Sequence, residues 1–410
     1  MHTLTTALLA ALLLSVARAV PLTRRSGQSI AAAWYAGWHA SNGFPVSAIS
    51  WGKYNTLVYS FAETTPSVDS ITLQGSDPDV LPDFVSQAKQ HKVAALVGIG
   101  GWSGSAYFSS DLGSQENRTK FANTLTNFVQ QYNLDGLNFD WEYPGVQGAG
   151  NNVVSPQDTS NFLTFLQEFR NTPTGQKLIL AASVPILPFR DAQGNPSKDV
   201  SGFAKVLNYI SIMNFDIFGS WSSAVGPNAP LADSCAPAKY QQGSAQGAVN
   251  AWTAAGIPAN QIVLGVPSYG HSYRVKPSDA FANDPSSEQG LSSEGQLAAY
   301  PPFDANDQPQ GDSWGGSSGT FEFWGLVQGG FLDTQGNPAQ GIYSRFDTCS
   351  QTPYLYNKTS EVMVSYDNPD SFTAKGAFIK QAGLRGFSMW EAGGDYKDLL
   401  LDAIRLSAGL

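Results

Sequence analysis

Acidic side chains interrupt a strongly apolar stretch, LDGLNFDWEYPG, which spans Leu134–Gly145. In a β-strand alternate side chains share one face, so Asn138, Asp140 and Glu142 would point one way and the large apolar residues between them the other. Carboxylates two residues apart on one face lie within about 7 Å, and each raises the cost of ionising its neighbour. One of the pair can therefore keep its proton near neutral pH. A proton held on Glu142 would supply the general acid that cleaves a glycosidic bond.

A polar core held together by hydrogen bonds is the alternative explanation of a buried acid. It would account for a single acid, whereas a stripe of Asn, Asp and Glu at the end of a strand favours catalysis. Other chemistries have weaker support. GIGGWSG (98–104) only partly matches a dinucleotide-binding fingerprint, and GVPSYG (265–270) lacks the spacing of a nucleophile elbow. The four histidines, at positions 2, 39, 91 and 271, form no ligand cluster, so we expect no metal site and no cofactor.

Short apolar runs alternate with longer amphipathic stretches along most of the chain. Several runs are almost continuously apolar, as expected of parallel strands that are covered on both faces. The runs occupy residues 31–38, 55–62, 92–102, 134–142, 177–185, 209–216, 261–270 and 384–391. Helix-like stretches between them include residues 81–91, 117–132, 158–171 and 370–383. Eight strands alternating with helices are typical of a (β/α)8 barrel, with an open doubly wound sheet as the alternative.

The alternation is interrupted between the seventh and eighth predicted strands. Residues 272–364 are rich in Gly, Pro, Ser and aromatic residues and contain short strand-like pieces such as TFEFWGLVQ (320–328). Because this segment is too long for a loop, we interpret it as a small α+β insertion domain. The catalytic barrel then comprises residues 29–271 and 365–410. In such a barrel the acidic stripe points inward, and Glu142 lies at the carboxyl end, where barrel active sites are found.

The amino end has the pattern of an export signal. A short polar start precedes the apolar run ALLAALLLSV (7–16), which is too short to span a bilayer, and the small-x-small site ARA (17–19) follows. We therefore expect residues 1–19 to be a signal peptide and the mature protein to be secreted and extracellular. Residues 20–28 are interpreted as a pro-segment or a disordered start. Within them Arg24–Arg25 is either a second processing point or a plain surface pair.

Composition restricts the partners. A formal net charge of −10 argues against nucleic acid and anionic lipid, and no later apolar run is long enough to cross a membrane. Aromatic residues make up 12% of the chain and include 10 Trp, more than a core alone usually requires, so some could line a surface for a flat-faced ligand such as a sugar. We expect a soluble monomer.

If the protein is exported, its two cysteines and its two N-glycosylation sequons become relevant. The two cysteines, Cys235 and Cys349, would form one disulfide in an oxidising compartment, although the sequence does not show that they are close. The sequons NRT at Asn117 and NKT at Asn357 would be sites of N-glycosylation.

The stretch DGLNFDWEYPG resembles the active-site signature Asp-x-x-Asp-x-Asp-x-Glu of glycoside hydrolase family 18, the family of chitinases. Asp135, Asp140 and Glu142 match this signature, and Asn138 replaces its second Asp. Similar segments extend over nearly the whole mature chain. They are YSFA (59–62), VGIGGW (97–102), MNFDIFGSW (213–221), GVPSYGHSY (265–273) and VSYDNPDSFTAKGAFIKQAGLRGFSMWEAGGD (364–395).

The resemblance implies a retaining hydrolysis of chitin or chito-oligosaccharides in which the substrate assists. The acetamido oxygen of the bound sugar would attack the anomeric carbon, while Glu142 protonates the leaving oxygen and later deprotonates water. Asp140 would orient the acetamido group, Asp216 would face it, and Trp390 would form the floor. The signature adds Asn138 and Asp135 to the catalytic set. The implied remaining walls are Tyr35, Trp102, Tyr143, Met213, Phe215, Trp221, Tyr269 and His271.

Departures from the family pattern define what must be tested. Phe215 replaces a Tyr whose hydroxyl would reach the acetamido oxygen, and Asn138 cannot ionise. Gly98 and His271 stand where Ser and Arg are common. We expect a chitinase whose insertion walls one side of the cleft. The alternatives are an endo-β-N-acetylglucosaminidase that acts on the chitobiose core of N-glycans, and a chitin-binding lectin that has lost catalysis.

Overall fold

The computed structural model describes residues 27–283 and 292–410 of the 410-residue chain. The predicted signal peptide 1–19, Arg24–Arg25 and the rest of 20–26 lie outside the described residues. Within the described ranges, no helix is both long and apolar enough to cross a membrane.

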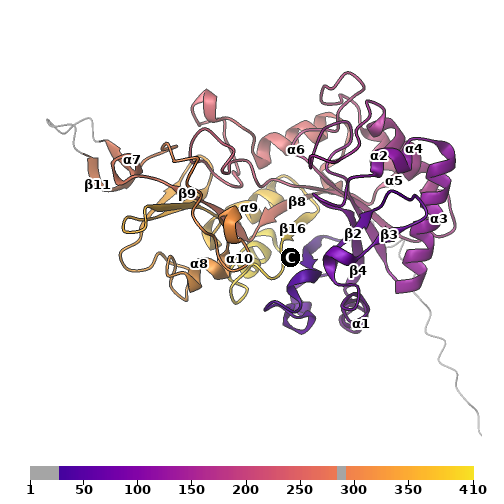
Figure 1. The fold of residues 1–410 in the computed structure, drawn as a ribbon, viewed down its shortest axis with the longest axis horizontal. Coiled ribbons are helices and arrows are strands. Elements are labelled where there is room, and N and C mark those ends of the chain that lie inside the picture. The colour runs from indigo at the N-terminus through magenta and orange to yellow at the C-terminus, as the bar shows by residue number, and fades with distance from the viewer. Residues whose placement is uncertain (1–26, 284–291) are drawn as a thin grey trace, which may run out of the picture.

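Eight parallel strands close into a barrel, which occupies the right of Figure 1. They are β1 (Ile30–Ala36), β2 (Thr56–Thr64), β4 (Ala94–Gly100), β5 (Gly136–Asp140), β6 (Ile179–Val184), β7 (Tyr209–Ile212), β8 (Ile262–Pro267) and β16 (Gly386–Trp390). The order β1-β16-β8-β7-β6-β5-β4-β2 is closed by pairing of β1 with β2, and a short strand β3 (Ile71–Thr72) is added antiparallel to β2. The closed ladder confirms the (β/α)8 barrel and excludes the open doubly wound sheet.

Helices follow most of the barrel strands and cover the outside of the barrel (Figure 1). The helix α3 begins where the Ser114 hydroxyl accepts a hydrogen bond from the Asn117 N–H, and it ends at Asn133 in the left-handed conformation. The barrel helices are α1 (Leu81–His91), α2 (Phe108–Leu112), α3 (Gln115–Tyr132), α4 (Asp158–Arg170), α5 (Ser201–Val206), α6 (Ala245–Ala254), α9 (Pro369–Gln381) and α10 (Leu399–Ala408). Short 3-10 helices are η2 (Gly37–His39), η3 (Val46–Ala48), η4 (Trp51–Lys53), η5 (Gln74–Ser76), η6 (Ala238–Tyr240), η7 (Ala259–Gln261) and η8 (Gly316–Ser318).

The insertion forms a second lobe, seen in orange at the left of Figure 1. Its elements are β9 (Tyr269–Arg274), α7 (Pro277–Ala280), β10 (Phe281–Asn283), β11 (Ser292–Leu297), β12 (Thr320–Glu322), α8 (Phe323–Gln328), β13 (Tyr343–Asp347), β14 (Thr352–Asn357) and β15 (Val362–Ser365). Five of these strands form a sheet in the order β12-β9-β15-β14-β13, and β10 pairs with β11. This arrangement confirms an α+β insertion between the seventh and eighth barrel strands. Its sheet begins at Tyr269, because only Ser268 separates β8 from β9.

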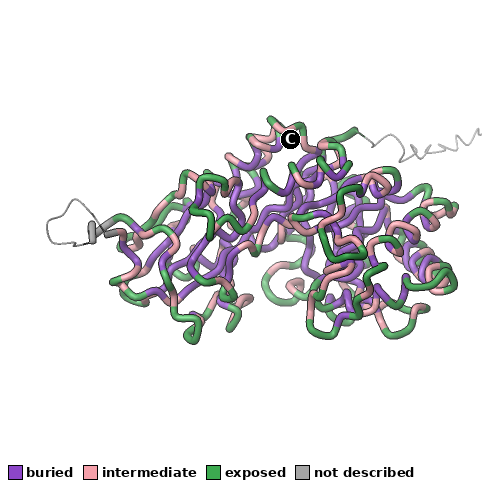
Figure 2. Tube along the Cα trace, turned by 90° about the horizontal axis from the view of Figure 1, so that it is seen from above, coloured by how far each residue is buried: buried purple, intermediate pink, exposed green. Residues whose placement is uncertain are grey.

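Alternation along each barrel strand divides the buried side chains into two cores. On β5, Leu137 and Phe139 face outward and pack in the layer between strands and helices, whereas Asn138 and Asp140 are buried inside the barrel. Figure 2 shows the buried trace running through the interior of both lobes. The same alternation corrects one prediction. Tyr35 belongs to the outer layer, where its ring stacks on Phe84 of α1 at 5.6 Å, so it is not a wall of the site.

A disulfide joins Cys235, in the segment between β7 and α6, to Cys349, in the turn between β13 and β14. The sequence had suggested this pairing without showing that the cysteines are close. The bond connects a loop at the carboxyl end of the barrel to the insertion, and it thereby restrains the wall that the insertion provides.

Candidate active site

A cleft of about 470 Å³ opens at the carboxyl ends of the barrel strands. Side chains from both the barrel and the start of the insertion line this cleft. The carboxyl ends of the strands are the usual location of a barrel active site. The sequence-predicted residues that the structure brings together here are Trp102, Asp140, Glu142, Tyr143, Met213, Phe215, Asp216, Tyr269 and Trp390.

Two acids occupy the centre of the cleft. Asp140 is the last residue of β5 and is 2% exposed, and burial raises its pKa to about 7. Glu142 lies just beyond the strand, and its pKa is well above the usual value, first because of burial and then because of the charge of Asp140. A hydrogen bond with Tyr143 opposes this shift, and the charge of Asp216 adds to it. The raised pKa favours the protonated form of Glu142, which is the form that a general acid requires.

The backbone around Glu142 is fixed on both sides. Its N–H donates to Ser105 Oγ at 3.0 Å, and its carbonyl accepts from Asn152 Nδ2 at 2.8 Å. The Ser105 hydroxyl in turn donates to the Asp140 carbonyl at 2.9 Å. These contacts hold the acid at the mouth of the barrel, in a position defined by the loops after β4 and β5.

Asp216 approaches the cleft from the segment after β7, with a left-handed backbone at φ 57°. Its N–H donates to Asn228 Oδ1 at 2.9 Å, which stabilises this uncommon conformation. One carboxylate oxygen, Oδ1, accepts from the Tyr269 hydroxyl at 2.7 Å and contacts His271 Nε2 at 2.8 Å. His271 and Tyr269 thus orient Asp216, and they come from β9, the first strand of the insertion.

Aromatic rings form the floor of the cleft. Trp390, at the end of β16, contacts Trp34 at 5.9 Å between ring centroids and is stacked on Phe61 at 5.6 Å. Trp102 and Trp221 are 56% and 64% exposed, so most of each indole remains available to a ligand. Flat, apolar faces of this kind suit the CH-rich faces of pyranose rings.

A second cavity of about 600 Å³ continues the cleft along the insertion. It shares Asp216, Tyr269 and Trp390 with the first cavity, and Trp221 and His271 also line it. Glu322 from β12 contributes a buried carboxyl whose pKa is raised well above its usual value, by burial first and then by the charge of Glu391. The insertion therefore supplies one side of a continuous groove.

Two residues of the predicted catalytic set have other positions. Asn138 is 1% exposed, inside the barrel below Asp140, and donates to Ser183 Oγ at 2.7 Å. Asp135 precedes β5 at the opposite end of the barrel. There it accepts from the Ala95 N–H at 2.9 Å and forms an ion pair with Lys89 at 2.6 Å. The assignment of Asp135 to the catalytic set is therefore wrong, because its contacts fix the start of the strand.

Sequence reasoning missed several residues near the acids. Trp34 and Phe61 line the cleft, and Ser183 lies beside Asp140. The period-2 pattern could not have suggested Phe61, because Tyr59 and Ala62 both belong to the outer layer and the strand is irregular between them. The placement of Ser183 depends on the register between β5 and β6.

The two sequon residues lie away from this cleft. Asn117 is in the first turn of α3, and Asn357 ends β14 in the insertion. Both side chains are partly exposed. Among the described residues, no group of three or more His, Cys, Asp or Glu is placed to hold a metal ion.

A closed barrel with paired carboxyls at its carboxyl end and an aromatic floor is typical of glycoside hydrolases. Comparison with known proteins agrees with this class: the model for glycosyl hydrolases family 18 matches residues 31–395. The chain belongs to this family.

Individual relatives cover nearly the whole chain. A protein of Moniliophthora roreri named chitinase-like effector is 47% identical over 396 residues, covering 94% of each chain. The crystal structure of a chitinase from Rhizomucor miehei is 30% identical, with a TM-score of 0.80, and the match covers 93% of this chain and 100% of that one. A chitinase from Cycas revoluta in complex with (GlcNAc)3 shares the fold, with a TM-score of 0.71 at 22% identity and coverage of 93% and 100%.

Proposed function

We propose that the protein is a secreted chitinase that hydrolyses β-1,4-linked N-acetylglucosamine polymers with retention of configuration. The observation that carries this proposal is the pair of acids in the cleft. Glu142 has a raised pKa beside Asp140, at the mouth of a family 18 barrel. The aromatic floor at Trp390 supports a sugar as the ligand.

The reaction uses the substrate's own acetamido group. Glu142 donates its proton to the glycosidic oxygen as the bond from that oxygen to the anomeric carbon breaks. The acetamido oxygen forms a bond to the same carbon from the opposite face, which gives an oxazolinium ion. Asp140 accepts a hydrogen bond from the acetamido N–H and stabilises the positive charge that develops there. The Glu142 carboxylate then takes a proton from water, and the hydroxide adds at the anomeric carbon. The bond from the acetamido oxygen to this carbon breaks, so the oxazolinium ring opens and the configuration is retained overall.

Phe215 is expected to slow this reaction. The family's Tyr hydroxyl would donate to the acetamido oxygen, and a phenyl ring has no donor. The nearby Tyr269 hydroxyl does not replace it, because it donates to Asp216. The loss of one such bond costs on the order of 1–3 kcal/mol of transition-state stabilisation.

Secretion is supported by the disulfide and by the sequence of the amino end. The bond between Cys235 and Cys349 is of the kind that forms in oxidising compartments. Two partly exposed sequons, Asn117 and Asn357, are compatible with glycosylation on the export route.

A second candidate is a protein that binds chito-oligosaccharides without turning them over. Two observations favour it: Phe215 and Asn138 depart from the family pattern, and the Moniliophthora roreri relative is named a chitinase-like effector. Glu142 favours the enzyme, since the proton donor is present and its pKa is suitably raised.

Product analysis on chitohexaose separates these functions. We expect the wild type to release shorter oligomers as the β-anomer, detected by chromatography and proton NMR. We expect Glu142→Gln to bind chitohexaose by calorimetry but to cleave it about 1000-fold more slowly. Glu168→Gln makes the same chemical change on the outer helix α4 and should leave the rate unchanged.

Other results on chitohexaose would favour a different function. Binding by the wild type without products supports the second candidate. Cleavage of a high-mannose glycopeptide without cleavage of chitohexaose indicates an endo-β-N-acetylglucosaminidase. If the wild type neither binds nor cleaves chitohexaose, both main candidates are rejected.

A further inference from the structure

A buried hydrogen-bond chain lies directly beneath the acid pair. Asn138 Nδ2 donates to Ser183 Oγ at 2.7 Å, and each of the two side chains is 1% exposed. Strands β5 and β6 are parallel, with Phe139 level with Ala182, so the next pair along the register is Asp140 with Ser183. Ser183 is therefore the neighbour of Asp140 across the two strands, and its hydroxyl lowers the pKa of the Asp140 carboxyl.

The direction of this chain follows from the donors available. An amide NH2 can only donate, so its bond occupies an acceptor position on the Ser183 oxygen. The single hydroxyl proton of Ser183 is then left for Asp140. The Asp140 oxygen Oδ1 is buried and has no protein partner among the described residues, which leaves it for the substrate.

We propose that Ser183 is a positioning residue for catalysis: Asn138 fixes its hydroxyl, and the hydroxyl donates to the Asp140 carboxylate and holds that group for the substrate. A serine on the neighbouring strand thereby supplies a contact that orients Asp140, although position 138 holds no acid. The proposal rests on the proposed function for the role of Asp140, but its first test requires no turnover.

The surroundings of Asp140 offer few other groups that could stabilise its negative charge. From β4, Gly98 and Gly100 lie level with Asn138 and Asp140 and present no side chain. The ionisable groups at the mouth of the barrel are Glu142 and Tyr143 after β5, Asp216 after β7 and Tyr269 on β9. His271 on β9 contacts Asp216. Among the described residues, no Lys or Arg lines this cleft. Burial raises the pKa of Asp140, and the neighbouring Ser183 hydroxyl lowers it.

Loss of the Ser183 hydroxyl should shift the pH dependence of the reaction in one direction. Asp140 must be ionised to stabilise positive charge, and its charge raises the pKa of Glu142 and so keeps the acid protonated. Loss of the Ser183 hydroxyl removes a bond to the ionised form and raises the pKa of Asp140. The acidic limb of the kcat/KM profile should then move to higher pH, while the alkaline limb, set by Glu142, should move less.

Two variants and a matched control test the proposal. Ser183→Ala removes the hydroxyl, and Ser183→Cys keeps nearly the same size with a weaker donor. Ser211→Ala removes a buried hydroxyl that lies level with Ser183 on β7, from a residue that does not line the cleft. The Asp140 carboxyl is titrated by carbon-13 NMR, with its signal assigned through its loss in Asp140→Asn. The kcat/KM profile on chitotetraose is measured in parallel.

We expect the Asp140 titration midpoint to rise by about 1 pH unit in Ser183→Ala and by less in Ser183→Cys, with no change in Ser211→Ala. An unchanged midpoint in Ser183→Ala would overturn the proposal, because the proton would then be donated elsewhere. Equal shifts in Ser183→Ala and Ser211→Ala would also overturn it, since they would indicate a general effect of packing. If the midpoint moves as expected but the wild type shows no turnover, the contact stands and the proposed hydrolysis fails.

Discussion

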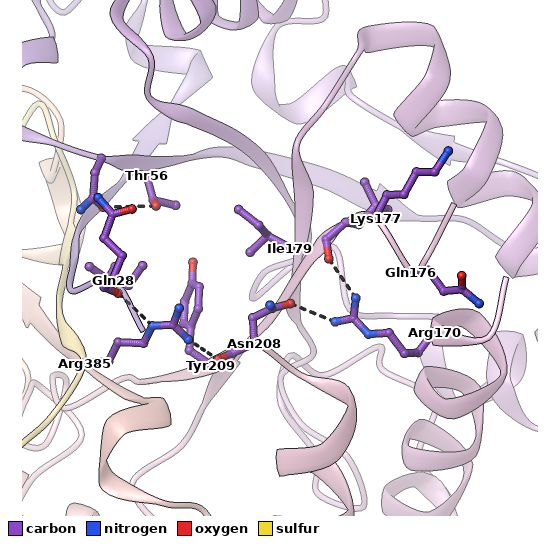
Figure 3. Close-up of a pocket in the computed structure, with 12 residues that line it drawn as sticks. Gln28, Thr56, Arg170, Gln176, Lys177, Ile179, Asn208, Tyr209 and Arg385 are labelled. Atoms are coloured by element: carbon purple, nitrogen blue, oxygen red, sulfur yellow. Dashed lines mark hydrogen bonds between the residues drawn. The ribbon is translucent and has the colours of Figure 1, made fainter. Parts of the chain in front are cut away.

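At the amino-terminal end of the barrel, Arg170 and Arg385 close the interior, whereas at the carboxyl-terminal end Asp140 and Glu142 lie in an open cleft. Figure 3 shows the closed end, where the two guanidinium groups approach Asn208 from opposite sides. Arg170 donates to the carbonyls of Val206, Gly175 and Leu178 and to Asn208 Oδ1 at 2.6–2.9 Å. Only about 70 Å³ remains between the side chains there.

The cleft has the opposite character. Asp140 Oδ1 and Trp34 Nε1 are buried there without a protein partner among the described residues. Asp216 has a left-handed backbone, and the pKa values of both central acids are raised. Burying polar groups without partners destabilises a fold, so these features are expected where a ligand completes the contacts.

Buried polar groups therefore have different roles at the two ends of the barrel. At the closed end, main-chain carbonyls satisfy the arginines, and the resulting network stabilises the fold. At the open end, hydrogen-bonding capacity is left for a substrate at the expense of stability. Variants at the two ends should therefore have opposite effects on stability and different effects on activity.

The largest expected effect is at the closed end. Arg170→Met leaves several buried carbonyls without donors, so we expect the free energy of unfolding to fall by about 3 kcal/mol, with kcat/KM unchanged. Denaturant unfolding measures the first quantity and hydrolysis of chitotetraose the second. Lys177→Met is the control, because this exposed residue borders the same cavity, and it should change stability by less than about 0.5 kcal/mol. A loss below about 1 kcal/mol in Arg170→Met would contradict the stabilising role of the network.

The next effect has the opposite sign. Burial raises the pKa of Asp140 from 3.8 to about 7, so the unfolded chain loses this proton at lower pH than the folded protein does. Stability should therefore fall as the pH rises through this window, and below pH 4 the penalty is absent. Asp140→Asn removes the penalty, and we expect it to stabilise the protein by about 2 kcal/mol at pH 8 but not at pH 3.5. Unfolding curves at both pH values test this. Equal gains at both would point to packing instead of ionisation.

Part of this contrast could be predicted from the sequence alone. The alternation of polar and apolar residues in 134–142 predicted which side of β5 faces inward, and Asp140 and Glu142 lie in the cleft accordingly. Continuous apolar runs predicted the barrel strands to within a few residues. Both predictions succeed because strand periodicity is a local property of the chain.

Other features could not be predicted from local pattern. In IAAAWYA (30–36) both faces of β1 are apolar, so nothing in the sequence indicates that Trp34 and not Tyr35 faces the interior. Asp135 is a different case: it was assigned from the acidic motif, although its odd spacing from Asp140 already places it on the other face of the strand and at the other end. The contacts of Ser183 depend on the register between two strands more than forty residues apart, which no single segment records.

A smaller effect, on kcat/KM, is expected from restoring the hydroxyl that is missing at Phe215. Phe215→Tyr places a hydroxyl where it can reach the acetamido oxygen, and we expect kcat/KM for chitotetraose to rise about tenfold. The gain should appear mainly in kcat, because the bond strengthens as charge develops on the acetamido group. An unchanged kcat/KM would mean that another group already supplies this hydrogen bond.

The smallest effect should be seen in pH dependence. Asn138→Asp introduces an acid beneath Asp140, and its carboxylate would accept the Ser183 proton that we propose is donated to Asp140. A neighbouring negative charge and a lost donor both raise the pKa of Asp140, so the acidic limb of the kcat/KM profile should move up by about 1 pH unit. Asn138→Leu, of similar size, serves as the control, since it lacks the new charge and should shift the limb less. An unchanged profile in Asn138→Asp would show that position 138 does not influence the ionisation of Asp140.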